Sequence, residues 1–171
     1  MPWFIGGLPL HPLVVHATVV LVPLAVLGAL VVVLWPAGRR RYGSLVVLTA
    51  VVATVCTVLA EQSGEALEQT MPRNPAIEAH AAAADYLKLW MTPLMIAIAA
   101  YVLMHRRADR TARLEASGTT SALALAGRQR VLAIGVAVVT VVLALGTALV
   151  VFQTGDLGAQ AVWGGRNYPG S

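Results

Sequence analysis

Four long apolar runs constrain the fold of this chain more than any other feature. They occupy residues 12–35, 45–60, 89–104 and 131–152, and an alanine-rich stretch from Ala76 leads into the third. A helix needs roughly 20 mostly apolar residues to cross a bilayer. The chain is also 58% hydrophobic and only 12% charged, about half the charged fraction typical of a soluble domain. The sequence therefore predicts an all-α, polytopic transmembrane four-helix bundle, with spans near 12–35, 45–62, 76–105 and 130–154.

The domain organisation is simple. Residues 1–11 contain no Lys or Arg, and the first apolar run is too long for the hydrophobic part of a signal peptide. We therefore expect a permanent first span and a single transmembrane domain over residues 1–165. Residues 114–127 are small and polar, which predicts a flexible inner loop, and residues 166–171 are expected to form a flexible outer tail.

The basic residues predict the orientation in the membrane. Nine of the twelve lie between the first and second spans or between the third and fourth, and such an excess marks the cytoplasmic side. They are Arg39, Arg40, Arg41, Arg106, Arg107, Arg110, Arg113, Arg128 and Arg130. We therefore expect a multi-pass protein of the bacterial plasma membrane with both termini extracytoplasmic. The net charge of +4 then reflects topology and anionic lipid headgroups, not a nucleic-acid partner.

Two short segments predict an internal repeat. The second span ends in Gln62-Ser63-Gly64-Glu65 and the fourth in Gln153-Thr154-Gly155-Asp156. Each follows an Arg-rich segment and an earlier span that carries a histidine near its outer end. This pattern indicates two helical hairpins in parallel pseudo-repeat, related by an axis along the membrane normal. In this interpretation His16 and His80 are symmetry mates.

The histidines are the main candidate site residues. His11, His16 and His80 are expected on the outer side, and ionisable groups at membrane depth are functional candidates by default. Neutral imidazole is a common metal ligand, and two imidazoles from different helices of a bundle suit haem b. We therefore predict a haem b or metal site on His16 and His80. His11 is a weaker metal candidate, because five residues turn it about 140° away from His16.

Two acids are expected to support this site. Glu61 and Asp156 follow spans that end at the same level, and a carboxylate that accepts a hydrogen bond from an imidazole fixes its tautomer. The alternative is structural. A histidine near the end of a span also forms hydrogen bonds with a carboxylate or water without binding any cofactor.

The sequence also resembles a known family. The segments "LPLHPLVVHATVVLVPLA", "AIEAHAAAADYL" and "TGDLGAQAVWGG" are similar to an uncharacterised bacterial, largely actinobacterial family of small four-span membrane proteins, some joined to Rieske-type ferredoxin modules. The resemblance covers Leu8 to Gly165 and implies a fold and a membrane location. Its pattern falls on His11, Pro12, His16, His80, Gly155, Gly158 and Trp163. The Rieske association suggests redox work, although this chain contains no such module.

Two functional hypotheses remain open on the sequence alone. The first is a redox accessory protein with a His-ligated haem b or metal near the outer leaflet, serving a redox partner or a larger membrane complex. The second is a cofactor-free structural or accessory subunit of such a complex. A transporter ranks lowest, because the inner half of every span is almost wholly apolar. The chain has no nucleophile–base pair, phosphate loop or metalloprotease motif, so we assign no catalytic residue and favour a non-enzymatic role.

Overall fold

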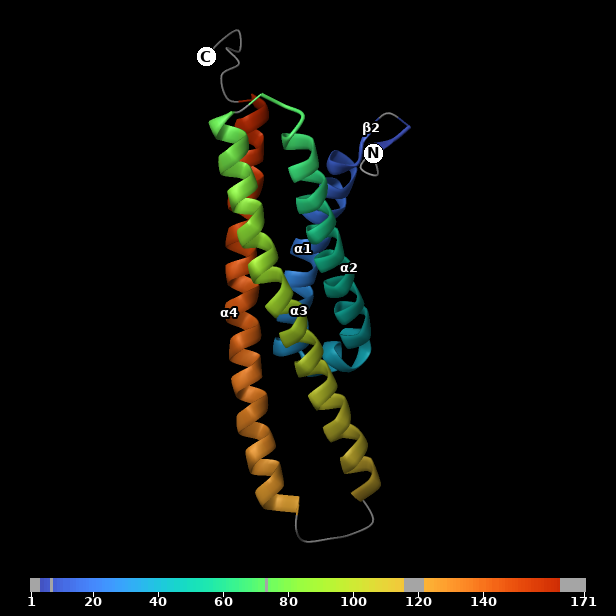
Figure 1. The fold of residues 1–171 in the computed structure, drawn as a ribbon. Coiled ribbons are helices and arrows are strands. Elements are labelled where there is room, and N and C mark those ends of the chain that lie inside the picture. The colour runs from blue at the N-terminus through green and yellow to red at the C-terminus, as the bar shows by residue number, and fades with distance from the viewer. Residues whose placement is uncertain (1–3, 7, 73, 116–121, 164–171) are drawn as a thin grey trace, which may run out of the picture.

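The computed structural model describes residues 4–6, 8–72, 74–115 and 122–163. Four helices dominate it: α1 (Leu10–Leu34), α2 (Pro36–Glu68), α3 (Pro75–Glu115) and α4 (Ala122–Trp163). Two short strands, β1 (Phe4–Ile5) and β2 (Leu8–Pro9), pair antiparallel just before α1. All four helices are long and apolar enough to cross a membrane. The predicted transmembrane four-helix bundle is thus confirmed, and the short strand pair is an addition to it (Figure 1).

The helices extend further than the predicted spans. α2 begins at Pro36 and not near residue 45, because proline is well suited to the first turn of a helix, where its missing N–H is not needed. Trp35 alone therefore separates α1 from α2, and the arginines at 39–41 are helical. Part of the expected inner loop is helical as well, since α3 continues to Glu115 and α4 starts at Ala122. The rest of that loop and the expected tail at 166–171 lie outside the described residues.

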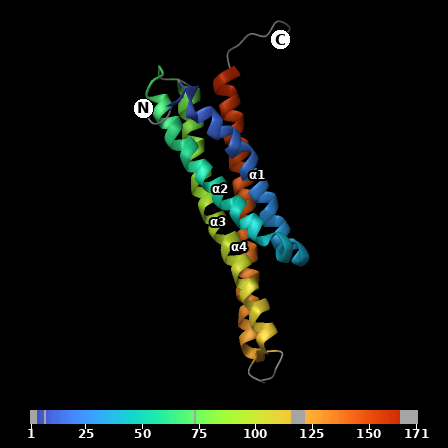
Figure 2. The same cartoon turned by 90° about the vertical axis from the view of Figure 1, so that its right-hand side faces the viewer.

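The bundle consists of two hairpins packed side by side. α1 packs mainly against α2 and α3 mainly against α4, while α2–α3 and α1–α4 contacts close the ring. α1 and α3 are therefore diagonal neighbours. The strand pair and the end of α4 lie at one end of the bundle, which we call the terminal end (Figure 1). At the opposite end, which we call the arginine end, α3 and α4 project well beyond the turn between α1 and α2 (Figures 1 and 2).

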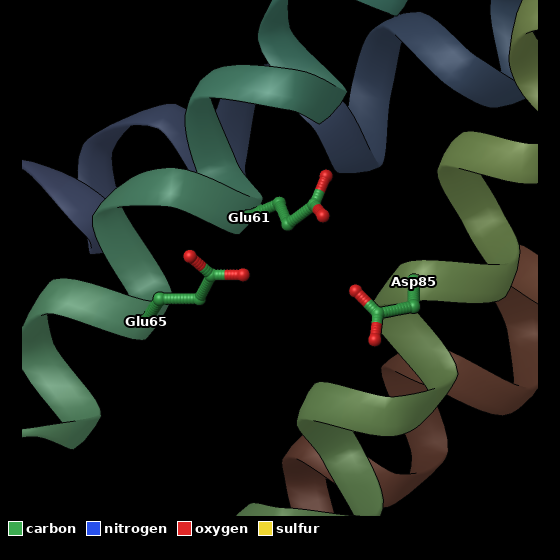
Figure 3. Close-up of side chains that lie close together, drawn as sticks. All are labelled: Glu61, Glu65 and Asp85. Atoms are coloured by element: carbon green, nitrogen blue, oxygen red, sulfur yellow. The ribbon is translucent and has the colours of Figure 1, made fainter.

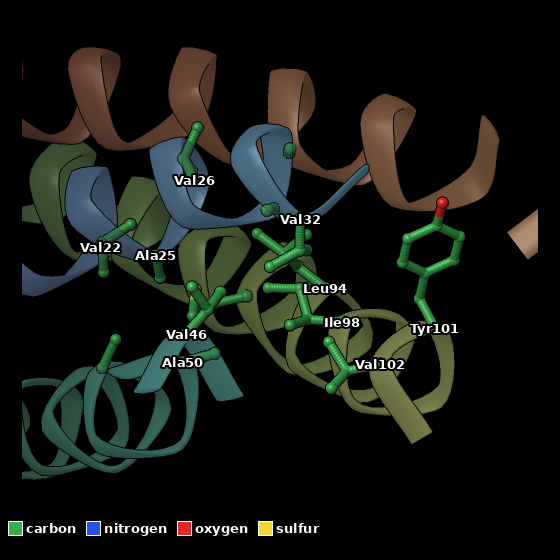
Figure 4. Packing of buried hydrophobic residues seen from close by; sticks show 14 of the residues in the cluster. Val22, Ala25, Val26, Val32, Val46, Ala50, Leu94, Ile98, Tyr101 and Val102 are labelled. Atoms are coloured by element: carbon green, nitrogen blue, oxygen red, sulfur yellow. The ribbon is translucent and has the colours of Figure 1, made fainter. Parts of the chain in front are cut away.

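Buried positions recur with a helical spacing, most regularly in α3. In α3 they include Leu87, Met91, Leu94, Ile98 and Tyr101. This spacing is that of helices packed nearly parallel or antiparallel in a bundle. Many buried side chains of α1 and α2 are alanine or valine (Figure 4), and small residues let helices in a membrane approach closely. Many other Leu, Val and Ile side chains are exposed on the outer surface of the bundle, as suits a protein whose outer solvent is lipid.

Candidate histidine site at the terminal end

His11 joins the first turn of α1 to α2. Its Nδ1 atom lies 2.9 Å from the carbonyl oxygen of Ala60, so the Nδ1–H donates to that carbonyl. The hydroxyl of the buried Ser63 donates to the same oxygen at 3.1 Å and lies 3.4 Å from Nδ1. The ring is half-buried. The contact therefore orients the imidazole of α1 from the backbone of the next helix.

His80 joins α3 to α4 in the same way. Its Nδ1 atom lies 3.0 Å from the carbonyl oxygen of Thr154. The hydroxyl of Thr154 lies 2.8 Å from the carbonyl oxygen of Val150 and 3.2 Å from that of Ala83, and its single proton is shared between them. Thr154 thus contacts α3 through both its backbone and its side chain, which holds His80 in place.

A glycine lies against each ring, four residues after the carbonyl that the ring contacts. A Cβ atom on Gly64 would lie 2.9 Å from Cε1 of His11, and one on Gly158 would lie 3.0 Å from Cε1 of His80. Both approaches are closer than side chains normally make. Each imidazole therefore packs on a stretch of bare helix backbone, and a Cβ atom at either glycine would require the ring to shift.

The two hairpins therefore make the same local contact, with His11 equivalent to His80 and Gly64 equivalent to Gly158. The expected pairings, His16 with His80 and Gly64 with Gly155, do not occur. Gly155 is exposed, and a Cβ atom there would meet nothing within 4 Å. The correct alignment of the second and fourth spans is shifted by three residues from the one that the Gln-x-Gly similarity suggests.

The structure gives His11, and not His16, the same kind of interhelical contact as His80. His11 and His80 belong to the diagonal helices α1 and α3, and each contacts the helix that follows its own. His16 is exposed, and its Nδ1 atom contacts the carbonyl oxygen of Pro12 in its own helix at 2.5 Å. His105 lies toward the arginine end, where its Nδ1 contacts the carbonyl oxygen of Tyr101 in α3. Of the four histidines, only His11 and His80 form hydrogen bonds between helices.

The expected supporting acids contact other groups. Glu61 forms an ion pair with Lys88 of α3, and Asp156 accepts a hydrogen bond from Gln160 at 2.8 Å. Backbone carbonyls occupy the positions expected for these carboxylates. Sequence reasoning missed this because every residue carries a carbonyl, so the acceptor leaves no mark in the sequence. The one residue that could have indicated the contact was Gly158. It belongs to the pattern of the family that the sequence resembles, and the sequence alone gave it no role.

Three carboxylates gather between α2 and α3. Ligand oxygens of Glu61, Glu65 and Asp85 lie within 4.8 Å of one another (Figure 3). Lys88 reaches toward the same cluster, and its ammonium group pairs with Glu61, the most buried of the three acids. Lys88 thus extends to the terminal end, as expected for a lysine that would otherwise lie bare in lipid.

The hydrogen bonds determine which ring nitrogen is available for chemistry. When Nδ1–H donates to a carbonyl, the lone pair of a neutral imidazole lies on Nε2. Among the described residues, neither Nε2 of His11 nor Nε2 of His80 has a hydrogen-bond partner. Metal-ligating histidines characteristically donate their second ring N–H to a backbone carbonyl or a carboxylate. The arrangement therefore offers two oriented nitrogen ligands from diagonal helices.

A comparison with protein families agrees with this architecture. A family model described as "Predicted membrane protein (DUF2231)" matches residues 7–167. The chain belongs to the DUF2231 family. The match spans all four helices and both histidine–glycine contacts of this DUF2231 protein. No curated protein and no solved structure matches the chain.

Proposed function

We propose that this DUF2231 protein is a redox accessory protein of the plasma membrane that holds haem b, or a metal ion, between His11 and His80. The observation that carries the proposal is the pair of equivalent hydrogen bonds from Nδ1 to the carbonyl oxygens of Ala60 and Thr154. Each bond fixes the ring and leaves Nε2 as the ligand atom.

The surroundings of the two rings support this proposal. Ala60, Ser63, Ala83 and Thr154 lie at the level of the histidines and are all small, which favours the close approach of a flat group. A haem held by the two imidazoles would supply one-electron transfer to or from a partner. The protein would then act as an electron carrier beside a redox partner or within a larger membrane complex, which agrees with the absence of a catalytic motif.

The proposed orientation places the terminal end, and with it the histidine site, on the extracytoplasmic side. The support is the uneven charge: nine of twelve basic residues belong to segments at the arginine end, the pattern of a cytoplasmic face. Electrons would then enter or leave near the outer leaflet of the plasma membrane.

The alternative is a cofactor-free structural or accessory subunit. It is favoured by the fact that both Nδ1 bonds already connect neighbouring helices, a structural role that needs no ligand. The two functions make different use of the imidazole. A structural histidine needs only the hydrogen bond from Nδ1, whereas a histidine that binds a cofactor also needs the lone pair of Nε2.

Substitution by asparagine separates these two roles. The amide nitrogen of Asn occupies roughly the position of Nδ1 and still donates to the carbonyl, but the side chain has nothing in place of Nε2. Wild type, His11→Asn, His80→Asn, His16→Asn and His105→Asn would be expressed in haem-replete cells and purified in mild detergent. Absorption spectra with and without dithionite and metal analysis would measure the bound cofactor.

The proposal expects a low-spin haem spectrum or a bound metal in wild type, His16→Asn and His105→Asn, and its loss in His11→Asn and His80→Asn with the helical circular dichroism unchanged. A colourless, metal-free wild type, or equal cofactor content in all five proteins, would overturn it in favour of the structural role.

A further inference from the structure

A positively charged groove lies at the arginine end, between the start of α2 and α3. Its volume is about 290 Å³, and Arg39, Arg40, Arg106 and Arg110 line it together with His105, Val102 and a single acid, Asp109. This groove is at the opposite end of the bundle from the histidine site, so it is independent of the proposal made for that site.

One wall of the groove is firmly built. The guanidinium group of Arg39 donates from Nη1 to the carbonyl oxygen of Val32 at 3.2 Å and to the hydroxyl of Tyr101 at 3.0 Å. Its Cζ atom also lies 5.2 Å from the centre of the Tyr101 ring, and the ring of His105 packs against the same tyrosine at 4.4 Å between centroids. Arg39 is therefore held in place by α1 and α3 and presents a fixed positive charge.

The other three arginines supply charge that the described residues do not neutralise. Arg106 and Arg110 are four residues apart on α3 and so lie on the same face of the helix. Arg40 faces them from α2, and all three side chains are exposed. Within the described part of the chain, the one ion pair is Lys88–Glu61 at the other end. Four guanidinium groups thus share one groove with a single carboxylate, which favours an anionic ligand.

The groove also lies where the apolar segment of α3 ends. Arg106 is the second residue after the apolar run that ends at Met104, and Arg39 lies five residues after the end of α1 at Leu34. The buried Val102 lies at the base of the groove, and the neighbouring Leu103 is half-exposed on the outer surface of α3. A bound anion here would have its polar group on the arginines and an apolar surface beside it.

We propose that this groove binds the phosphate group of an acidic phospholipid, with its acyl chains along the outer surface of α3. Arginine binds phosphate oxygens through paired N–H donors, and basic pockets between transmembrane helices are suited to acidic headgroups. A free phosphate ion has the same charged oxygens as the headgroup but makes no contact with the adjoining apolar surface. The experiment distinguishes the phospholipid from the free ion.

The test uses the full-length protein in detergent and native mass spectrometry to count retained lipids. Phosphatidylglycerol is titrated against phosphatidylcholine, which has the same phosphate but no net charge. Thermal shift then compares the stabilisation by inorganic phosphate with that by phosphatidylglycerol. The groove variant is Arg106→Gln/Arg110→Gln. The matched control is Arg128→Gln/Arg130→Gln, which removes two exposed arginines of α4 outside the groove. Arg39 is left intact because its bonds support the fold.

The expected result is preferential retention of phosphatidylglycerol over phosphatidylcholine. The groove variant should bind it about tenfold more weakly, and the control should stay within about twofold of wild type. Equal losses in the two double variants would show a diffuse charge effect and overturn the proposal. So would equal retention of both lipids, or stabilisation by inorganic phosphate as large as that by phosphatidylglycerol.

Discussion

Gly158 lies directly against the imidazole of His80, so that a Cβ atom at position 158 would come within 3.0 Å of the ring. We expect Gly158→Ala to push the ring away from the carbonyl oxygen of Thr154 and to destabilise the protein by about 1–3 kcal/mol, as overpacking of a close contact does. Gly64→Ala should do the same to His11. Thermal and chemical unfolding in detergent would measure both effects, and the cofactor content should fall with them.

Gly155→Ala is the matched control for these two variants. It lies on α4 three residues before Gly158, but a Cβ atom there would meet nothing within 4 Å. Because alanine is the better helix former, this change should be neutral or stabilising by up to about 1 kcal/mol. If Gly64→Ala, Gly158→Ala and Gly155→Ala changed the stability equally, the conclusion that the imidazoles pack on bare helix backbone would be wrong.

Thr154 provides a second test of the contact between α3 and α4. Thr154→Val keeps the carbonyl that His80 contacts but removes the hydroxyl that lies 3.2 Å from the carbonyl oxygen of Ala83. We expect a loss of about 0.6 kcal/mol, typical of one hydrogen bond between membrane helices, with the cofactor retained.

Thr147→Val is the comparison for this change, measured by the same unfolding experiment. Thr147 is also buried, but its hydroxyl bonds only to the carbonyl oxygen of Leu143 in its own helix. Its replacement should therefore cost less than that of Thr154. A larger loss at Thr147 would contradict the view that the interhelical hydroxyl contact matters.

The sequence predicted the bundle well because its signals are long and redundant. Run length alone identifies four spans, and the buried positions of α3 from Leu87 to Tyr101 keep a regular helical spacing. The start of α2 was less predictable, because Pro36 is compatible either with the end of one helix or with the first turn of the next. Helix boundaries depend on such local alternatives, whereas the number of spans does not.

The site was predicted only in part, for physical reasons. His80, one of the two predicted residues, contacts the carbonyl oxygen of Thr154 on α4. The other, His16, is exposed; it was preferred to His11 because a short Gln-x-Gly similarity fixed the alignment of the hairpins. The partners of the rings are backbone carbonyls, which no residue type reveals. Glu61 was expected near a histidine, yet Lys88 from the next helix pairs with it. Two residues at the same level along the membrane normal can lie on different faces of their helices, so the level alone does not show that they are in contact.

The Glu61–Lys88 pair connects α2 to α3, and its contribution is measurable by a double-mutant cycle. Glu61→Gln leaves the ammonium group of Lys88 with the two remaining acids of the cluster, Glu65 and Asp85. We therefore expect a modest loss of about 1 kcal/mol, between the values for exposed and buried pairs. Glu65→Gln, which removes an exposed acid of the same cluster, should cost less.

The cycle is completed by Lys88→Met and by the double variant, with unfolding followed in detergent. The double variant should be less destabilised than the sum of the two single changes, because each single change already removes the interaction. Strict additivity would show that the two side chains contribute independently and that the pair does not hold α2 against α3.

The orientation of the bundle is tested by cysteine labelling in intact cells. In a Cys56→Ala background, Arg41→Cys and Thr70→Cys each place one thiol at an exposed position, so labelling reports the side of the membrane and not burial. The excess of basic residues at the arginine end predicts that this end is cytoplasmic. An impermeant maleimide should therefore label position 70 and spare position 41, and both should react after the cells are permeabilised. Labelling of position 41 alone in intact cells would invert the orientation and place the histidine site on the cytoplasmic side, where its redox partner would then have to be sought.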